Sequence, residues 1–143
     1  MGRLTLAQAD AIIDAALAKA RESGMKPLMV VVVDDAGNLK AARREDGAGG
    51  ALRPQVALGK AFGAIGMGQS SRRLGEGALE RPHFTSALVG ASGGRIIPVA
   101  GGVPFADGDG ETIGAIGVSG DTSDNDEVAA LAGIAAAGLT PLP

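Results

Sequence analysis

The chain has 143 residues, a formal net charge of −3 and no Cys, Trp or Tyr. The missing cysteines exclude disulfides, thiolate nucleophiles and thiolate metal sites, and the acidic balance with only three Phe argues against a nucleic-acid-binding protein. We expect a single domain over residues 1–143 that is soluble and cytoplasmic, because we find no signal peptide and no apolar run of the roughly 20 residues that span a membrane.

The N-terminal part of the chain predicts a helix followed by a β-hairpin. Thr5 and Gln8 have the spacing of a capping box, and apolar residues then recur at helical intervals until Gly24, where the helix is expected to end. Residues 28–33 form an apolar, mostly β-branched run that is typical of a buried strand. Turn-forming residues 34–38 connect this strand to a second one over residues 39–44, and a loop over 45–50 follows.

Two helices are predicted in the middle of the chain. Residues 51–65 show helical periodicity, with Pro54 in the first turn, where its missing N–H is tolerated. Ser70 or Ser71 is a suitable N-cap for a short helix that continues to Leu79 and is closed by Pro82. Residues 83–94 are predicted to be irregular and glycine-rich.

The C-terminal part predicts three strands and a last helix. Residues 96–99 are predicted to be an edge strand or a bulged one, because Pro98 lacks an N–H. Residues 101–105 lead into a further strand, 107–110 form a turn, and 112–119 form a third strand. The last helix begins near Ser123, where Ser123 and Asp126 resemble a second capping box, and ends at Gly138. The predicted order, α-β-β-α-α-β-β-β-α, indicates an α+β protein with an antiparallel sheet.

Glycine is unusually frequent, with 24 residues, and several glycines fall inside predicted strands, at 101–102 and at 114, 117 and 120. A glycine inside a strand costs roughly 0.5–1 kcal/mol relative to alanine, so something must compensate. Either a helix or second subunit packs closely on these strands, or a ligand lies against the bare backbone. No phosphate-binding loop is present, and the glycines at 63, 66 and 68 end a helix instead of opening one.

Three groups of side chains are candidates for a site. His83 is the only histidine, and it is either an ordinary residue or a ligand of a haem iron. Arg43, Arg44 and Lys60 are either solvated or ion-paired, or they form a site for a carboxylate or propionate. Four acids lie near the start of the last helix: Asp121, Asp124, Asp126 and Glu127. Either the helix dipole favours their negative charge at the helix N-terminus, or they bind a divalent cation, although their spacing does not match the calcium loop.

The order and spacing of several sequence blocks resemble the GlcG/HbpS family of haem-degrading or haem-binding-like proteins, which also matches the C-terminal domain of PduO-type proteins. The resemblance covers nearly the whole chain. It is carried by the blocks at 32–39 (VVDDAGNL), 44–48 (REDGA), 60–62 (KAF), 101–104 (GGVP) and 114–120 (GAIGVSG), and by the acidic helix start at 126–127.

This resemblance implies a profilin-like α+β fold, with an antiparallel sheet of about five strands flanked by helices, and it implies homo-oligomers. Members of the family are associated with haem binding, with corrinoid or diol metabolism and with glycolate use. The haem ligand is not uniform in the family, so His83 is a candidate only as the sole histidine of this chain.

Three functions follow as hypotheses. The first is a small-molecule-binding protein for haem or another tetrapyrrole, with His83 on the iron and Arg44, Lys60, Gly101 and Gly102 around the acidic substituents. The second is a cofactor-free enzyme for a small hydroxy or oxo acid, in which Lys60 is the base or amine and Asp34, Asp46 or Asp126 shares proton transfer. A buried Lys60 that faces a cleft would favour the enzyme. The third is an oligomeric structural subunit without pocket chemistry.

Overall fold

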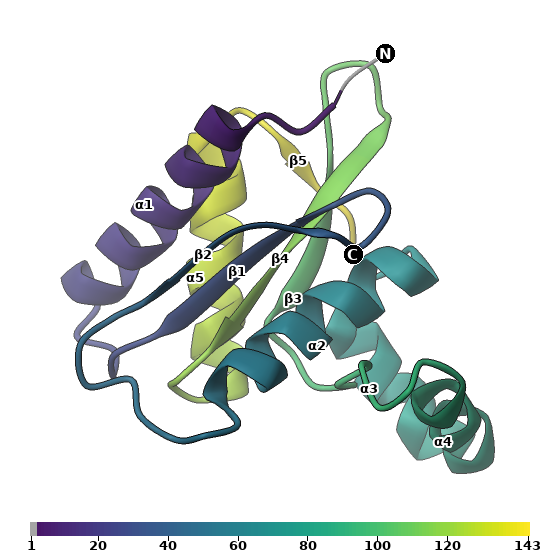
Figure 1. Ribbon diagram of the computed structural model, residues 1–143. Helices are drawn as coiled ribbons and strands as arrows, with labels where there is room; N and C mark the ends of the chain where they lie inside the picture. Colours follow the sequence, from purple (N-terminus) through teal and green to yellow (C-terminus); the bar gives the residue numbers. More distant parts are fainter. Residues whose placement is uncertain (1–2) are drawn as a thin grey trace.

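The computed structural model describes residues 3–143 (Figure 1). Its strands are β1 (Met29–Asp34), β2 (Leu39–Arg44), β3 (Gly102–Ala106), β4 (Thr112–Ser119) and β5 (Thr140–Pro141). They form one antiparallel sheet in the order β2-β1-β4-β3-β5. Its helices are α1 (Leu6–Glu22), α2 (Arg53–Met67), α3 (Ser71–Glu80), α4 (Pro82–Ala91) and α5 (Ser123–Ala136). The predicted α+β fold with a five-stranded antiparallel sheet is confirmed.

The helices cover the two faces of the sheet unequally (Figure 1). α1 and α5 pack side by side on one face, where Ile12 and Ile13 of α1 meet Val30 and Val32 of β1 in the larger hydrophobic core. α2 crosses the other face, and its alanines pack on β1 and β4 in a smaller core. α3 and α4 form a helical hairpin that extends from the end of α2 and projects away from the sheet. The α3–α4 hairpin therefore makes few contacts with the strands.

α2 packs so closely on the sheet that two strand positions have room only for glycine. A methyl group at Gly117 of β4 would overlap the backbone carbonyl of Ala57, and one at Gly102 of β3 would overlap that of Lys60. Both carbonyls belong to α2. Of the two explanations that the sequence left open, a helix packed directly on the sheet therefore accounts for these positions, and no ligand is required there.

Two predicted segments differ from the structure. Residues 83–94, predicted to be irregular, are mostly helix α4, because Pro82 not only follows the end of α3 but also occupies the first turn of the next helix. Residues 96–99 form no strand. Ile96 and Ile97 instead pack on glycines of α2, and the N–H of Ile97 donates to the carbonyl of Gly59, so this segment follows the helix and not the sheet.

The predicted helix caps are confirmed at α1 and α3 and are wrong at α5. Thr5 and Gln8 form the predicted capping box of α1, and Ser70 caps α3. At α5 the cap is Thr122 and not Ser123, and Asp126 is unavailable for a capping box because its carboxylate turns into the protein. None of the helices among residues 3–143 is long and apolar enough to span a membrane.

Candidate functional site

A buried ion pair joins α2 to α5. Lys60 Nζ lies 3.1 Å from Asp126 Oδ2 and donates to the carbonyl of Val118, at the end of β4, over 2.9 Å. Only 3% of Lys60 and 1% of Asp126 is exposed. The other Asp126 oxygen accepts the backbone N–H of Asp121 at 2.9 Å. The pair therefore connects two helices to the last residues of a central strand.

Burial dominates the electrostatics of this pair. Desolvation lowers the pKa of Lys60 below its usual value, and Arg53 lowers it further, while the charge of Asp126 acts in the opposite direction. Desolvation likewise raises the pKa of Asp126, against the opposing effects of the Asp121 N–H and of Lys60. Each charge is thus tolerated inside the protein mainly because the other is present.

The glycines at 101 and 102 lie beside this ion pair. A methyl group at Gly101 would contact the Lys60 ammonium and the Val118 carbonyl. Ser71, which is completely buried, accepts the N–H of Gly102 at 2.7 Å and donates to its carbonyl at 3.3 Å. The structure thus brings Lys60, Asp126, Gly101 and Gly102 together, but Lys60 and Asp126 are buried, and none of the cavities described below reaches Lys60.

Arg44 and Asp46 lie elsewhere, at the end of the β1–β2 hairpin. They line a cavity of about 450 Å³ with Arg21, Arg43 and Pro27. Arg43 is bound to Asp14 of α1 at 2.6 Å, and Arg21 is bound to Glu45 at 3.0 Å. Among residues 3–143, the Arg44 side chain makes one hydrogen bond, a long one of 3.4 Å to the Ala48 carbonyl. We expected Arg44 and Lys60 to lie together in the folded protein, but they belong to separate sites.

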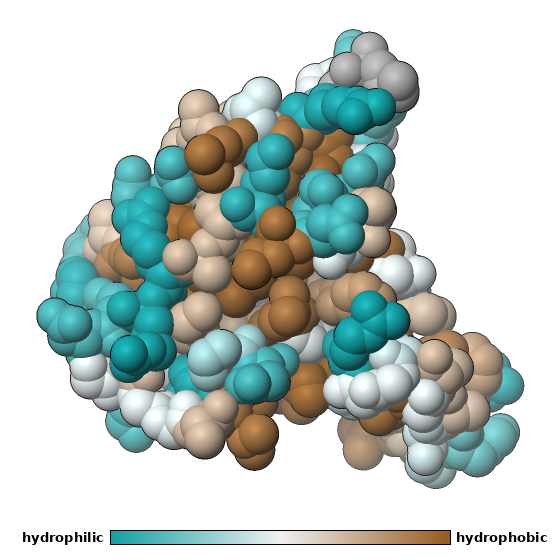
Figure 2. Space-filling model, in the orientation of Figure 1, coloured by the Kyte–Doolittle hydropathy of each residue, from teal (hydrophilic) through white to brown (hydrophobic). Residues whose placement is uncertain are grey.

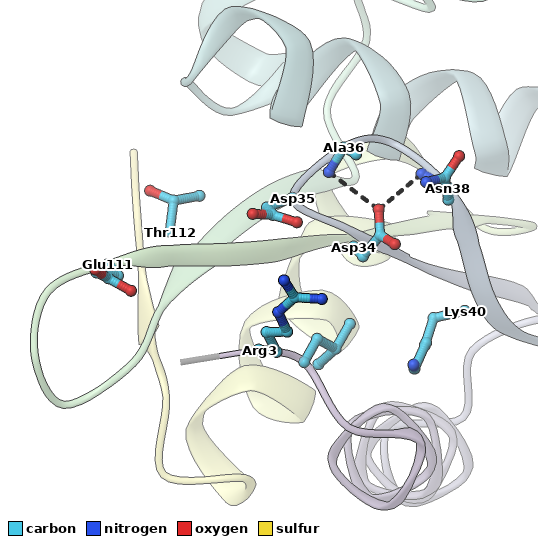
Figure 3. A pocket seen from close by; sticks show the side chains of 9 residues that line it. Arg3, Asp34, Asp35, Ala36, Asn38, Lys40, Glu111 and Thr112 are labelled. Carbon is cyan, nitrogen blue, oxygen red and sulfur yellow. Dashed lines mark hydrogen bonds between the residues drawn. The ribbon is translucent and has the colours of Figure 1, made fainter. Parts of the chain in front are cut away.

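Asp34 lines a cavity of about 630 Å³ at the opposite end of the hairpin (Figure 3). One of its carboxylate oxygens accepts the N–H groups of Ala36 and Asn38, so Asp34 shapes the turn. Arg3 and Lys40 face the same space from the N-terminal segment and from β2 (Figure 3). This cavity is polar and has charges of both signs.

His83 lies apart from all of these residues, exposed in the first turn of α4. The α3–α4 hairpin that holds it also has hydrophobic side chains at its surface: Leu79 is 87% exposed and Phe84 is 41% exposed. Hydrophobic patches of this projection are visible in Figure 2. Met67, Phe84 and Leu88 line a shallow cavity of about 170 Å³ between the two helices. Arg81 stacks on Phe84, with its guanidinium 4.5 Å from the ring centre.

The acidic residues near the start of α5 are divided among separate partners. Asp121 accepts the N–H groups of Lys26 and Thr122, Asp126 binds Lys60, and the remaining two acids, Asp124 and Glu127, bind Arg72 of α3. No group of acids and His83 within residues 3–143 is arranged to hold a metal ion. These acids therefore connect the start of α5 to α2, to α3 and to the segment that contains Lys26.

Two polar contacts, one buried and one partly buried, are not indicated by the sequence. The sequence indicates Ser71 only as a helix cap, although its hydroxyl also binds Gly102, and Arg53 donates to the Ser119 hydroxyl at 2.9 Å. Both contacts join residues more than 30 positions apart. No local pattern in the sequence indicates such a pairing.

The sheet order and the helices on its two faces define a profilin-like α+β protein. A sequence model of the family described as "Haem degrading protein HbpS-like" matches residues 4–135, and the chain belongs to this family. No curated protein sequence matches the chain.

Solved structures share the fold. HbpS is 31% identical, with a TM-score of 0.80 over 94% of this chain and 90% of that chain. The protein ORFY of Klebsiella pneumoniae is 28% identical, with a TM-score of 0.85 over 96% of this chain and 93% of that one. A complex of PduOC with haem is 24% identical, with a TM-score of 0.88 over 99% of this chain and all of that one.

Proposed function

We propose that this protein binds haem or another tetrapyrrole with acidic substituents. Membership of the HbpS-like family supports the ligand class, and so does the haem held by the structural neighbour PduOC. The observation on this chain that carries the proposal is the exposed imidazole of His83 on a helical hairpin that also exposes Leu79 and Phe84.

The residues of the hairpin suit a tetrapyrrole. A haem requires a ligand for the iron, apolar surface for the ring and cations for the propionates. His83 supplies an imidazole, Leu79 and Phe84 supply exposed apolar surface, and Arg81 supplies a guanidinium in the same segment. Arg81 forms no ion pair with any residue among 3–143, so its charge is available to a propionate.

A single chain provides a surface for only one face of the haem ring. The cavity between α3 and α4, about 170 Å³, is lined by Arg81 and Phe84 but not by His83 or Leu79, and it is smaller than the roughly 300–1,000 Å³ of sites for drug-sized ligands. A haem on this surface would leave one face of its ring in water. We therefore propose that a second copy of the chain packs against the hairpin and covers that face, which makes the protein a homo-oligomer.

Titration of the purified protein with haemin tests the proposed function. We expect a saturable shift of the Soret band that reaches one haem per chain or per pair of chains. Iron-free protoporphyrin should bind more weakly, because the bond to the imidazole is lost. A Soret band that grows in proportion to haemin without saturation would contradict the proposal.

A further inference from the structure

A second concave site lies at the N-terminal end of α3, between α3, α5 and the C-terminal segment. This groove has a volume of about 250 Å³ and is walled by Val103 of β3, Leu131 of α5, and Pro141 and Leu142 after α5. The C-terminal segment is fixed in place, because the N–H of Leu142 donates to the carbonyl of Pro104 at 2.8 Å. The surface that lines the groove is almost entirely apolar.

The polar side chains at the rim of the groove differ in their charge balance. Arg72 is bound by Glu127 at 3.0 Å and also by Asp124, so its charge is compensated. Arg73, the next residue, also lines the groove, and its guanidinium has neither an ion pair nor a hydrogen bond to any residue among 3–143. The groove therefore combines an apolar interior with a cation, Arg73, that forms no ion pair with any residue among 3–143, while Glu127 at the same groove is bound to Arg72.

We propose that this groove binds a small monocarboxylate with an apolar body, of the size and shape of a phenylalkanoate. The apolar walls would take the ring, and Arg73 would take the carboxylate through paired N–H donors, which is the geometry that guanidinium groups favour. The volume of about 250 Å³ is below the roughly 300–1,000 Å³ typical of drug-sized ligands, so a tetrapyrrole is excluded from the groove. The groove does not include His83, although Arg73 also lines the cavity between α3 and α4.

The test uses 3-phenylpropionate and its uncharged analogue 3-phenylpropan-1-ol, each titrated into the isotope-labelled protein and followed by amide NMR. We expect saturable shifts for the carboxylate around Val103, Leu131 and Leu142. Arg73→Ala should weaken carboxylate binding about tenfold, as expected for one charge-assisted contact, and should leave binding of the alcohol unchanged. Arg73 is exposed, and the cap of α3 uses only its backbone N–H, so the variant should fold.

Lys40→Ala is the matched control, because it removes one exposed cation on β2, away from the groove. It should bind the carboxylate like the wild type. Leu131→Ala should weaken the binding of both compounds, because both depend on the apolar wall. The proposal is overturned if neither compound gives saturable shifts, if the shifts map to another surface, or if Arg73→Ala and Lys40→Ala bind the carboxylate equally well.

Discussion

Lys60 and Asp126 are 66 positions apart in the sequence, yet they form an ion pair at 3.1 Å that is almost completely removed from water. Around it, Lys60 also donates to the Val118 carbonyl, and Asp126 also accepts the Asp121 N–H. No buried side-chain polar atom among residues 3–143 lacks a partner. The pair therefore holds α2, α5 and the end of β4 in a fixed relation.

Breaking this pair should destabilise the fold strongly. Lys60→Met leaves the Asp126 carboxylate buried without its cation, and Asp126→Asn leaves the ammonium without its anion, so each should cost about 3–5 kcal/mol of unfolding free energy. The double variant should lose less than the sum, because neither buried charge is then unpaired. Urea denaturation of all four proteins measures this coupling. Losses that add to within about 0.5 kcal/mol would show that the two residues are not coupled.

Gly102 and Gly66 should respond in opposite ways to alanine. At Gly102 the new methyl group meets the Lys60 carbonyl of α2, which cannot move without shifting the helix, so Gly102→Ala should cost about 1–3 kcal/mol. At Gly66, in α2, the methyl group meets open space, and Gly66→Ala should stabilise the protein by about 0.5–1 kcal/mol. Thermal or urea unfolding of both variants tests the close contact. Equal effects at the two positions would disprove it.

Asp121 should titrate at unusually low pH. Its carboxylate accepts N–H groups from Lys26, Asn125 and Thr122, which lower its pKa from 3.8 to about 2. Because the folded pKa is below the unfolded one, this group stabilises the fold above about pH 4, and the contribution disappears as the pH falls from about 4 to about 2. Carboxyl NMR titration measures the pKa directly. An Asp121→Asn variant should show a shallower loss of stability over that interval, and an unchanged slope would contradict the assignment.

The α3–α4 hairpin should mediate self-association. Sedimentation velocity of the wild type should give a mass that is a multiple of the 14.0 kDa chain. Leu79→Glu places a charge on the exposed apolar surface of the hairpin and should shift the protein toward the monomer. Leu52→Glu is the control, since Leu52 is a similarly exposed leucine outside the hairpin. A monomeric wild type, or dissociation by both substitutions alike, would contradict the proposed interface.

The sequence predicted the elements that depend on local patterns. The capping box at Thr5, the β-branched run of β1 and the turn between β1 and β2 are all short-range signals, and the structure confirms each of them. Helix α4 was missed because the segment between Pro82 and Gly94 is rich in small residues, and Pro82 was interpreted only as the end of α3.

The arrangement of the candidate site could be predicted only in part. The cluster of Lys60, Asp126, Gly101 and Gly102 depends on how α2 packs across the sheet, and the glycines suggested such a contact without indicating the helix. The separation of Arg44 from Lys60 and of His83 from both depends on tertiary packing, which residue spacing along the chain does not determine.

The most direct measurement is a haemin titration of the wild type and of His83→Ala, followed by the Soret band, with Ser86→Ala as a control on the same exposed helix. If His83 holds the iron, His83→Ala should weaken binding at least about tenfold and move the Soret maximum, while Ser86→Ala binds like the wild type. Identical spectra and affinities for the three proteins would remove His83 from the site. Absence of saturable binding in the wild type would contradict the proposed function itself.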